Sequence, residues 1–149
     1  MPLSGVKILV VEDHPDSREV IRRMLAFRGA LVTVAADGEE ALRKIAEDCP
    51  DLILCDLMMP HMDGYELAQR VRRMPEGAHV RLVALTALSD DTAYFKTWSV
   101  GYDAHVEKPV TFEKLEALAV QFLLGRQEPP KRPSKRRPKR PSTRRRKSN

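Results

Sequence analysis

Short apolar runs alternate with amphipathic segments along most of the chain. The first run, V-K-I-L-V-V at residues 6–11, is almost continuously apolar, and runs follow at 30–36, 51–56 and 80–85, with a shorter one around 103–107. Apolar runs of this length, rich in Val, Ile and Leu, are typical of strands buried on both faces of a parallel sheet. The pattern therefore predicts five strands.

Between these runs, apolar side chains recur at helical spacing and polar side chains occupy the opposite face. Pro15 suits the first turn of the first such segment, and Gly125 suits the end of the last one. The predicted helices cover residues 16–28, 38–48, 65–73, 90–99 and 112–124. Strands alternating with helices favour a doubly wound α/β domain with helices on both faces of a parallel sheet.

Polar residues follow the predicted strands. Glu12 and Asp13 come after the first strand, and Asp56 ends the third. Thr86 follows the fourth strand and Lys108 the fifth. In doubly wound folds the carboxyl ends of the strands border the ligand site. Carboxylates gathered there repel one another unless a cation lies among them, and oxygen ligands favour a hard divalent ion such as Mg²⁺.

Several motifs carry a family resemblance. They are V-V-E-D at residues 10–13, D-L-M-M-P-H-M-D-G at 56–64, L-T-A-L at 85–88 and G-Y-D-A-H-V-E-K-P at 101–109. Together, over residues 5–125, they resemble the receiver domain of two-component response regulators, whereas each motif alone is weak. The resemblance implies a flavodoxin-like (βα)5 domain with strand order 2-1-3-4-5, similar to a stand-alone chemotaxis regulator.

The same resemblance implies roles for the acidic residues. Asp56 would be the phosphoacceptor, and Glu12 and Asp13 would hold Mg²⁺ directly or through water. Asp56 and the backbone carbonyl of Met58 would complete the metal site. Phosphoryl transfer depends mainly on positioning and charge neutralisation, which such a set of groups supplies.

Thr86 and Lys108 would bind oxygens of the phosphoryl group once it has arrived. The resemblance also implies a switch, in which Thr86 moves toward the phosphoryl group and a side chain of the fifth strand turns into the space it leaves. The family often has Tyr or Phe at that position, but this chain has His105. An imidazole can fill a similar space and titrates near neutrality, and the alternative is a half-buried side chain without a signalling role.

Met58 and Leu88 bear on the lifetime of the phosphorylated state. Family members with polar residues two places after the acceptor and two places after the threonine can position a hydrolytic water. The apolar side chains at these positions cannot do so. We therefore expect a long-lived aspartyl phosphate.

These features predict a response regulator that takes its phosphoryl group from a sensor histidine kinase or a phosphotransfer protein. Output to a downstream protein would pass through the surface of the fourth helix, fifth strand and fifth helix, with the chain a monomer or a phosphorylation-dependent dimer. The chain would not be an enzyme beyond Mg²⁺-dependent autophosphorylation and autodephosphorylation. A phosphatase of the haloacid-dehalogenase type would need an acid at Met58, and a nucleotide-binding module would need a Gly-rich loop after the first strand.

Charge divides the chain into two parts. The formal net charge is +5, but residues 1–125 carry 14 Lys/Arg and 20 Asp/Glu, whereas residues 126–149 carry 12 and 1. The second part is almost entirely Lys, Arg, Pro, Ser and Thr, and repeats P-K-R-P-S at 130–134 and 138–142. Such a composition cannot form a core, so we expect a receiver domain over 1–125 followed by a disordered basic tail.

The tail leaves the function of the whole chain open in one respect. It could bind the nucleic-acid backbone without sequence preference, dock on an acidic protein or anionic lipid surface, or serve solubility alone. A nucleic-acid-binding protein that uses its receiver only as a scaffold is therefore a third class of function beside the regulator and the phosphatase.

Cys49 and Cys55 have no metal-ligand spacing to the histidines and are expected to be reduced residues of the core. His14, His61 and His79 are expected in surface loops. The chain begins without a basic leader and has no long apolar stretch, so we expect a soluble cytoplasmic protein.

Overall fold

A single parallel sheet organises the chain. The computed structural model describes residues 3–87 and 91–123. The strands are β1 (Lys7–Val11), β2 (Leu31–Ala35), β3 (Leu52–Asp56), β4 (Arg81–Thr86) and β5 (Ala104–Glu107). All neighbours pair in parallel in the order β2-β1-β3-β4-β5, which confirms the predicted topology.

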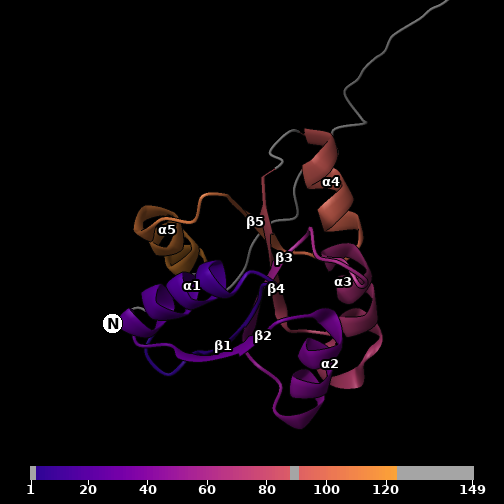
Figure 1. Cartoon of the computed structure of the whole chain (residues 1–149), viewed down its shortest axis with the longest axis horizontal. Coiled ribbons are helices and arrows are strands. Elements are labelled where there is room, and N and C mark those ends of the chain that lie inside the picture. The colour runs from indigo at the N-terminus through magenta and orange to yellow at the C-terminus, as the bar shows by residue number, and fades with distance from the viewer. Residues whose placement is uncertain (1–2, 88–90, 124–149) are drawn as a thin grey trace, which may run out of the picture.

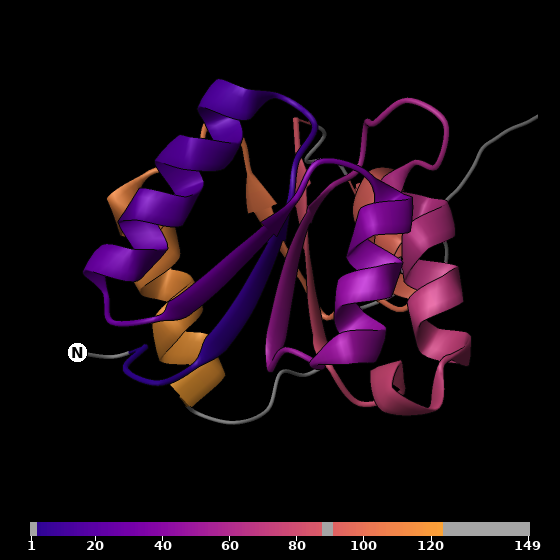
Figure 2. The same cartoon turned by 60° about the horizontal axis from the view of Figure 1, so that its bottom comes forward.

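Helices cover both faces of this sheet. They are α1 (Pro15–Phe27), α2 (Gly38–Glu47), α3 (Gly64–Arg73), α4 (Asp91–Ser99) and α5 (Phe112–Leu123), with a 3₁₀ turn η1 (Pro75–Gly77). Helices α1 and α5 lie on one face, and α2, α3 and α4 on the other (Figures 1 and 2). The sequence pattern predicted every helix and strand to within about a residue but did not predict η1.

The two faces of the sheet carry two apolar clusters. Along β1, Leu9 and Val11 point into the cluster under α2 and α3, while Ile8 and Val10 point into the cluster under α1 and α5. All four side chains are fully buried. Because β1 and β3 are central and covered on both sides, their sequences are continuously apolar instead of alternating.

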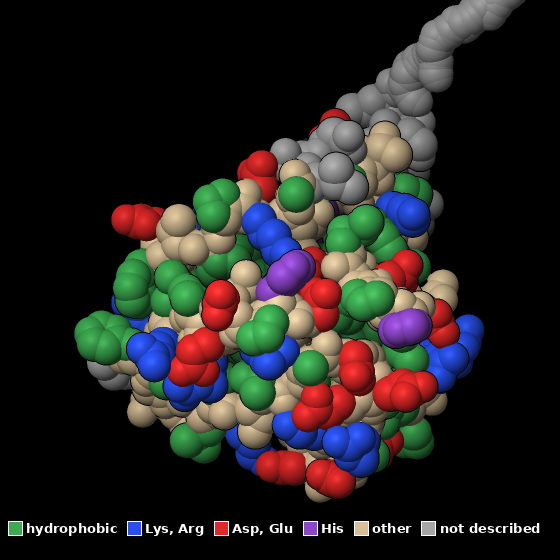
Figure 3. All heavy atoms as spheres, in the orientation of Figure 1, with side chains coloured by type: hydrophobic (Ala, Val, Ile, Leu, Met, Phe, Trp, Pro, Cys, Tyr) green, Lys and Arg blue, Asp and Glu red, His purple; other side chains and the backbone are tan. Residues whose placement is uncertain are grey.

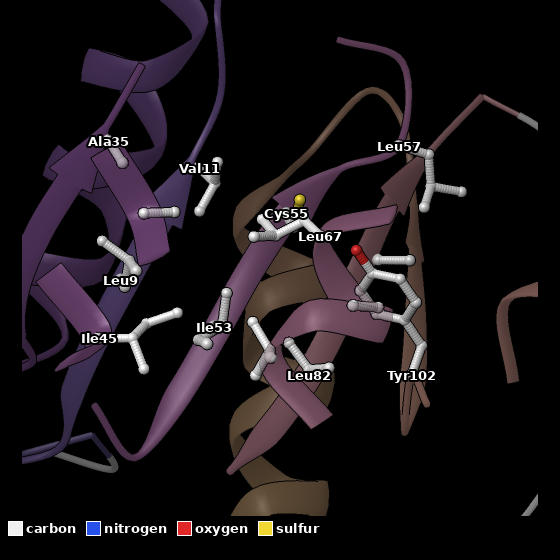
Figure 4. Close-up of a cluster of buried hydrophobic side chains, with 14 of the residues drawn as sticks. Leu9, Val11, Ala35, Ile45, Ile53, Cys55, Leu57, Leu67, Leu82 and Tyr102 are labelled. Carbon is white, nitrogen blue, oxygen red and sulfur yellow. The ribbon is translucent and has the colours of Figure 1, made fainter. Parts of the chain in front are cut away.

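Figure 4 shows the cluster under α2 and α3, which includes Cys55 and Tyr102. The Tyr102 hydroxyl donates a hydrogen bond to the carbonyl oxygen of Gly64 at 2.8 Å, so the segment before β5 is tied to the start of α3. Burial raises the pKa of the Cys55 thiol to about 12. Cys55 and the half-buried Cys49 are both free, as expected of reduced core residues.

Aspartates define where α2 and α3 begin. The Asp37 carboxylate accepts a hydrogen bond from the backbone N–H of Glu40 at 2.8 Å, and Asp63 accepts one from Glu66 at 2.9 Å. Each aspartate satisfies a backbone donor that has no partner within its own helix.

None of the described helices is long and apolar enough to cross a membrane.

Arg72 joins three segments at the amino-terminal edge of the sheet. Its guanidinium donates to the carbonyl oxygens of Gly101 and Val80, each at 2.6 Å, and to that of Gly77 at 3.0 Å. It also pairs with Asp103 at 3.0 Å. A planar guanidinium with several fixed donors can satisfy this set of acceptors at once, which a lysine ammonium cannot.

We predict that Arg72→Ala lowers the free energy of unfolding by about 2 to 4 kcal/mol, because several partly buried carbonyls lose a charged donor. Arg72→Lys is expected to recover less than half of that loss. Urea denaturation measures both, with the exposed neighbour Arg73→Ala as the matched control, expected within about 0.5 kcal/mol of wild type. Equal losses of stability in Arg72→Ala and Arg73→Ala would contradict the proposal that the Arg72 guanidinium stabilises the fold by joining these segments.

Candidate functional site

The strand register brings the predicted polar residues to one edge. Val11 is paired with Cys55, and Asp56 with Leu85, so the residues after β1 and at the end of β3 lie side by side. Thr86 is paired with Glu107, which places Lys108 next to the end of β4. The carboxyl ends of the parallel strands therefore carry the candidate site, as the sequence predicted.

Lys108 bridges two buried carboxylates at this edge. Its Nζ lies 3.1 Å from Oδ2 of Asp56 and 3.6 Å from Oε1 of Glu12. Glu12 is 0 % and Asp56 is 3 % exposed. The other oxygen of Asp56, Oδ1, accepts a hydrogen bond from the backbone N–H of Met58 at 3.2 Å. Asp56 is thus held by a donor on each of its oxygens.

The electrostatics reflect this crowding. Burial raises the pKa of Glu12, and the neighbouring charge of Asp56 raises it further. Partial burial alone would lower the pKa of Lys108, but its hydrogen bond to Asp56 and the charges of Asp56 and Glu12 outweigh burial and raise it. One ammonium group therefore faces more negative charge than it can neutralise.

The acidic residues fit a divalent cation. Oε1 of Glu12 and Oδ1 of Asp13 are shielded from solvent, and neither accepts a hydrogen bond from any described residue. Ligand atoms of Glu12, Asp13 and His14 all lie within 4.8 Å of one another. Carboxylate oxygens left without donors in a negative cluster are the ligands that Mg²⁺ and similar hard ions take. Figure 3 shows histidine and acidic side chains next to each other near the centre of one face.

Gly64 sets how closely α3 approaches the end of β3. A Cβ at this position would lie 2.7 Å from the Cα of Leu57 and 2.8 Å from the carbonyl oxygen of Asp56. The Gly64 N–H also donates to the Leu57 carbonyl at 3.0 Å. The absence of a side chain at Gly64 therefore allows the loop after Asp56 to close tightly.

Backbone contacts fix Thr86 and Lys108 relative to each other. The Lys108 N–H donates to the carbonyl oxygen of Thr86 at 2.8 Å, and Thr86 itself is 2 % exposed. Lys114 of α5 donates to the carbonyl oxygens of Glu107 at 2.8 Å and Pro109 at 3.1 Å. These bonds hold the turn that carries Lys108, whose peptide bond to Pro109 is cis.

A groove of ≈ 590 Å³ opens beside the site, between α1 and the segment that follows β5. Its lining residues are Glu12, Asp16, Ser17, Val20, Ile21, Lys108, Pro109 and Val110. Val20 is 50 % exposed in spite of its apolar side chain. The groove gives a partner molecule an approach to the side of the site that Lys108 and Glu12 form.

His105 contacts α4. Its ring lies 4.3 Å from the ring of Tyr94, and its Nε2 is hydrogen-bonded to the hydroxyl of Thr97. The Thr97 hydroxyl donates to the Tyr94 carbonyl at 2.8 Å, so its oxygen accepts from the Nε2–H of His105. Burial lowers the pKa of His105, which agrees with the neutral form.

The structure thus brings Glu12, Asp13, Asp56 and Lys108 together, with Thr86 at the same edge. His105 lies on the neighbouring strand and contacts α4. Met58 contributes its backbone N–H, and its side chain is 71 % exposed. Leu88 lies outside the described residues.

Sequence reasoning missed three contributors. Arg18 donates to the Glu12 carbonyl at 2.9 Å, and Thr97 binds His105. His14 is exposed as expected, yet its Nδ1 lies 3.5 Å from Glu12 and 3.7 Å from Asp13. Only His14 carried a signal in the sequence, because it directly follows the two acidic residues.

The fold and the site define a doubly wound α/β protein with a cluster of acidic residues at the carboxyl ends of its strands. The chain belongs to the response regulator receiver domain family, whose family model matches residues 8–120. It is therefore a receiver of two-component signal transduction, which confirms the interpretation of the motifs.

Individual relatives agree with this assignment. The chain is 39 % identical over 122 residues to an uncharacterized 14.6 kDa protein of Leptolyngbya boryana. The alignment covers 82 % of this chain and 93 % of that protein. It is 39 % identical over 125 residues to the response regulator MprA of Mycobacterium bovis, covering 84 % of this chain and 53 % of MprA. The chain therefore spans about half the length of MprA.

A solved structure is also similar. The receiver domain of the sensor histidine kinase PA1611 of Pseudomonas aeruginosa PAO1 matches with a TM-score of 0.72 and 34 % identity, covering 82 % of this chain and 99 % of that one. That structure contains a magnesium ion coordinated in its active site cleft.

The burial of His105 predicts a pH-dependent stability. The folded protein lowers the pKa of His105 below its ordinary value of 6.5, so the unfolded chain binds the proton first as the pH falls. The contribution of neutral His105 to the free energy of unfolding is therefore fully present when the pH is above that ordinary pKa. It is lost as the pH drops toward the lower pKa of the folded state. The groups facing the ring are the Thr97 hydroxyl and Tyr94, whose own pKa is raised by burial.

We expect the free energy of unfolding of wild type to fall more steeply between about pH 7 and pH 5 than that of His105→Phe, which cannot titrate. Denaturation at a series of pH values measures the two slopes. His79→Asn removes an exposed imidazole and should keep the wild-type slope. Parallel curves for wild type and His105→Phe would show that His105 is not held in its neutral form.

Proposed function

We propose that Asp56 is the residue of this receiver that accepts the phosphoryl group. The observation that carries the proposal is the pair of donors on its buried carboxylate, Lys108 at 3.1 Å on one oxygen and the Met58 N–H at 3.2 Å on the other. These donors orient the carboxylate at the edge of the sheet. An ionised carboxylate needs no general base before it attacks phosphorus.

The transfer exchanges one bond to phosphorus for another. A carboxylate oxygen of Asp56 forms the new bond while the bond between phosphorus and an imidazole nitrogen of the donor breaks, and the donor keeps that electron pair. Lys108 then pairs with a phosphoryl oxygen, and the Thr86 hydroxyl donates a hydrogen bond to another. Both groups stabilise charge that the transition state spreads over these oxygens.

The acidic residues would hold Mg²⁺ through Glu12, Asp13, Asp56 and the backbone carbonyl of Met58. Support comes from the carboxylate oxygens of Glu12 and Asp13 that lack donors, and from the similarity to the magnesium-containing receiver of PA1611. When bound, the ion neutralises phosphoryl oxygens and the carboxylates around them. The protein's own part is to place those carboxylates on rigid central strands.

The donor would be a sensor histidine kinase or a phosphotransfer protein that reaches the site along the groove between α1 and the segment after β5. The phosphorylated receiver would signal to a downstream protein through α4, β5 and α5, as a monomer or a phosphorylation-dependent dimer. We propose a phosphoacceptor switch instead of an enzyme that turns over a substrate. A cytoplasmic location fits such a partner.

The proposed division of the chain places the receiver in residues 1–125 and a basic tail in 126–149. The tail lies outside the described residues, and its net charge of +11 is opposite in sign to the −6 of the preceding part. Binding to nucleic acid or to an acidic partner through this charge stays a prediction.

We expect wild-type protein treated with acetyl phosphate and Mg²⁺ to gain the mass of one phosphoryl group, and Asp56→Asn to gain none. Mass spectrometry of the intact protein measures this. Asp63→Asn, which changes an exposed cap residue in the following loop, is the matched control and should be modified like wild type. The same adduct on Asp56→Asn would place the acceptor elsewhere.

The lifetime of the phosphoryl group provides a further prediction. The Met58 side chain is exposed beside Asp56 and offers a water molecule no hydrogen-bond acceptor of useful strength. Met58→Asn should shorten the half-life of the phosphoprotein at least about tenfold, because a polar side chain there can orient a hydrolytic water.

Loss of label from purified phosphoprotein in Mg²⁺, without a phosphatase, measures the half-life. Met58→Leu keeps an apolar side chain and should behave like wild type. If wild type loses its label as fast as Met58→Asn, the predicted long lifetime is wrong.

A further inference from the structure

His14 starts α1 without capping it. Residues at this helix position are usually Ser, Thr, Asp or Asn, whose side chains accept a hydrogen bond from the first turn. The His14 side chain makes no such bond, and the next residue is Pro15. The helix therefore makes no use of the imidazole.

The imidazole instead faces the acidic residues. Its Nδ1 lies 3.5 Å from Oε2 of Glu12 and 3.7 Å from Oδ1 of Asp13. Two ligands that each lie about 2.1 Å from one ion are roughly 3 to 4 Å apart. The nitrogen is thus already spaced from each of the two carboxylate oxygens as two ligands of one ion are, and ligand atoms of all three residues lie within 4.8 Å of one another.

The backbone holds His14 in this position. Its N–H donates to Oε2 of Glu12 at 3.2 Å, and its carbonyl accepts from the N–H of Arg18 at 2.9 Å. The Arg18 side chain donates to the Glu12 carbonyl at 2.9 Å. Two of these hydrogen bonds connect the start of α1 to Glu12, and the third joins His14 to Arg18 within the first turn.

A second observation points to a ligand. Glu12 is fully buried, and its Oε1 accepts no hydrogen bond from any residue the structure describes. Lys108 lies 3.6 Å away from this oxygen and is shared with Asp56. A buried carboxylate oxygen without a donor leaves a position that a cation would satisfy.

We propose that His14 is a nitrogen ligand that makes this site selective for borderline first-row divalent ions such as Co²⁺ and Zn²⁺ over Mg²⁺. The inference rests on the proposed function, since it concerns the same cation site. Mg²⁺ prefers oxygen ligands and retains several waters, so it gains little from an imidazole. Transition ions gain strongly from imidazole nitrogen.

The consequence is a receiver whose resident ion depends on which metals are available. With Mg²⁺ alone, the carboxylates hold the ion and His14 stays in solvent. With a transition ion present at much lower concentration, the imidazole nitrogen joins the carboxylate oxygens and the ion is exchanged. The residue at position 14 then decides the metal, while Asp56 and Lys108 keep their roles.

Titration calorimetry of the full chain with Mg²⁺ and separately with Co²⁺ tests the proposal. His14→Asn introduces a good cap residue and replaces the nitrogen ligand by an amide oxygen. We expect it to weaken Co²⁺ binding at least about tenfold and to change Mg²⁺ binding less than about twofold. His79→Asn removes an exposed imidazole elsewhere and should change neither.

A spectroscopic measurement reports the ligand directly. Bound Co²⁺ should shift the ring-proton resonances of one histidine far outside the usual range in wild type and in His79→Asn. Those resonances should be absent from His14→Asn, although Co²⁺ at higher concentration still occupies the site.

Each other outcome has a defined meaning. An unchanged ratio of Co²⁺ to Mg²⁺ affinity in His14→Asn overturns the role of His14, and the proposed function stands if Mg²⁺ still binds and Asp56 is still phosphorylated. Tighter binding of both ions by His14→Asn also overturns it, since His14 would then be a competing positive charge. Failure of wild type to bind either ion overturns the cation site itself, and with it the proposed function.

Discussion

The concentration of negative charge at the carboxyl edge of the sheet is the constraint on which the rest of the site depends. Glu12 and Asp56 are buried there, with Asp13 beside them, and Lys108 supplies the one ammonium group that pairs with both buried residues among the described part of the chain. Buried charge without a partner costs several kcal/mol per ion in proteins, on the order of a large share of a domain's stability. The edge is therefore sensitive to any added charge, whether a cation or a phosphoryl group.

The fold can carry this cost because the charged residues follow or end two of the strands that are covered on both faces. The apolar side chains of β1 and β3 leave the strand ends little freedom to separate. Lys108 is in turn bonded through its backbone to Thr86, so a change of charge at Asp56 acts on β4 and β5 together.

The sequence predicted this architecture well because each strand is an apolar run that ends at a polar residue, such as Glu12 after β1. The location of the site could be predicted too, because parallel strands bring their carboxyl ends to one edge of the sheet. Contacts made by distant segments were not predictable in this way. Arg72 reaches carbonyls on either side of β4, and Thr97 meets His105 only because α4 lies over β5. The roles of individual site residues came from the family resemblance, not from the pattern.

Helix α4 is attached to the sheet differently from the other helices. None of its described residues belongs to the two apolar clusters, and its buried side chains are Ala93 and Thr97. Its contact with β5 is instead made at His105, which is hydrogen-bonded to Thr97 and lies against the ring of Tyr94. Elements with few buried apolar contacts sit at the low-stability end of a protein and shift most easily. A change that reaches β5 through Lys108 therefore meets a helix held by few buried apolar contacts, which supports the proposed output through α4 and β5.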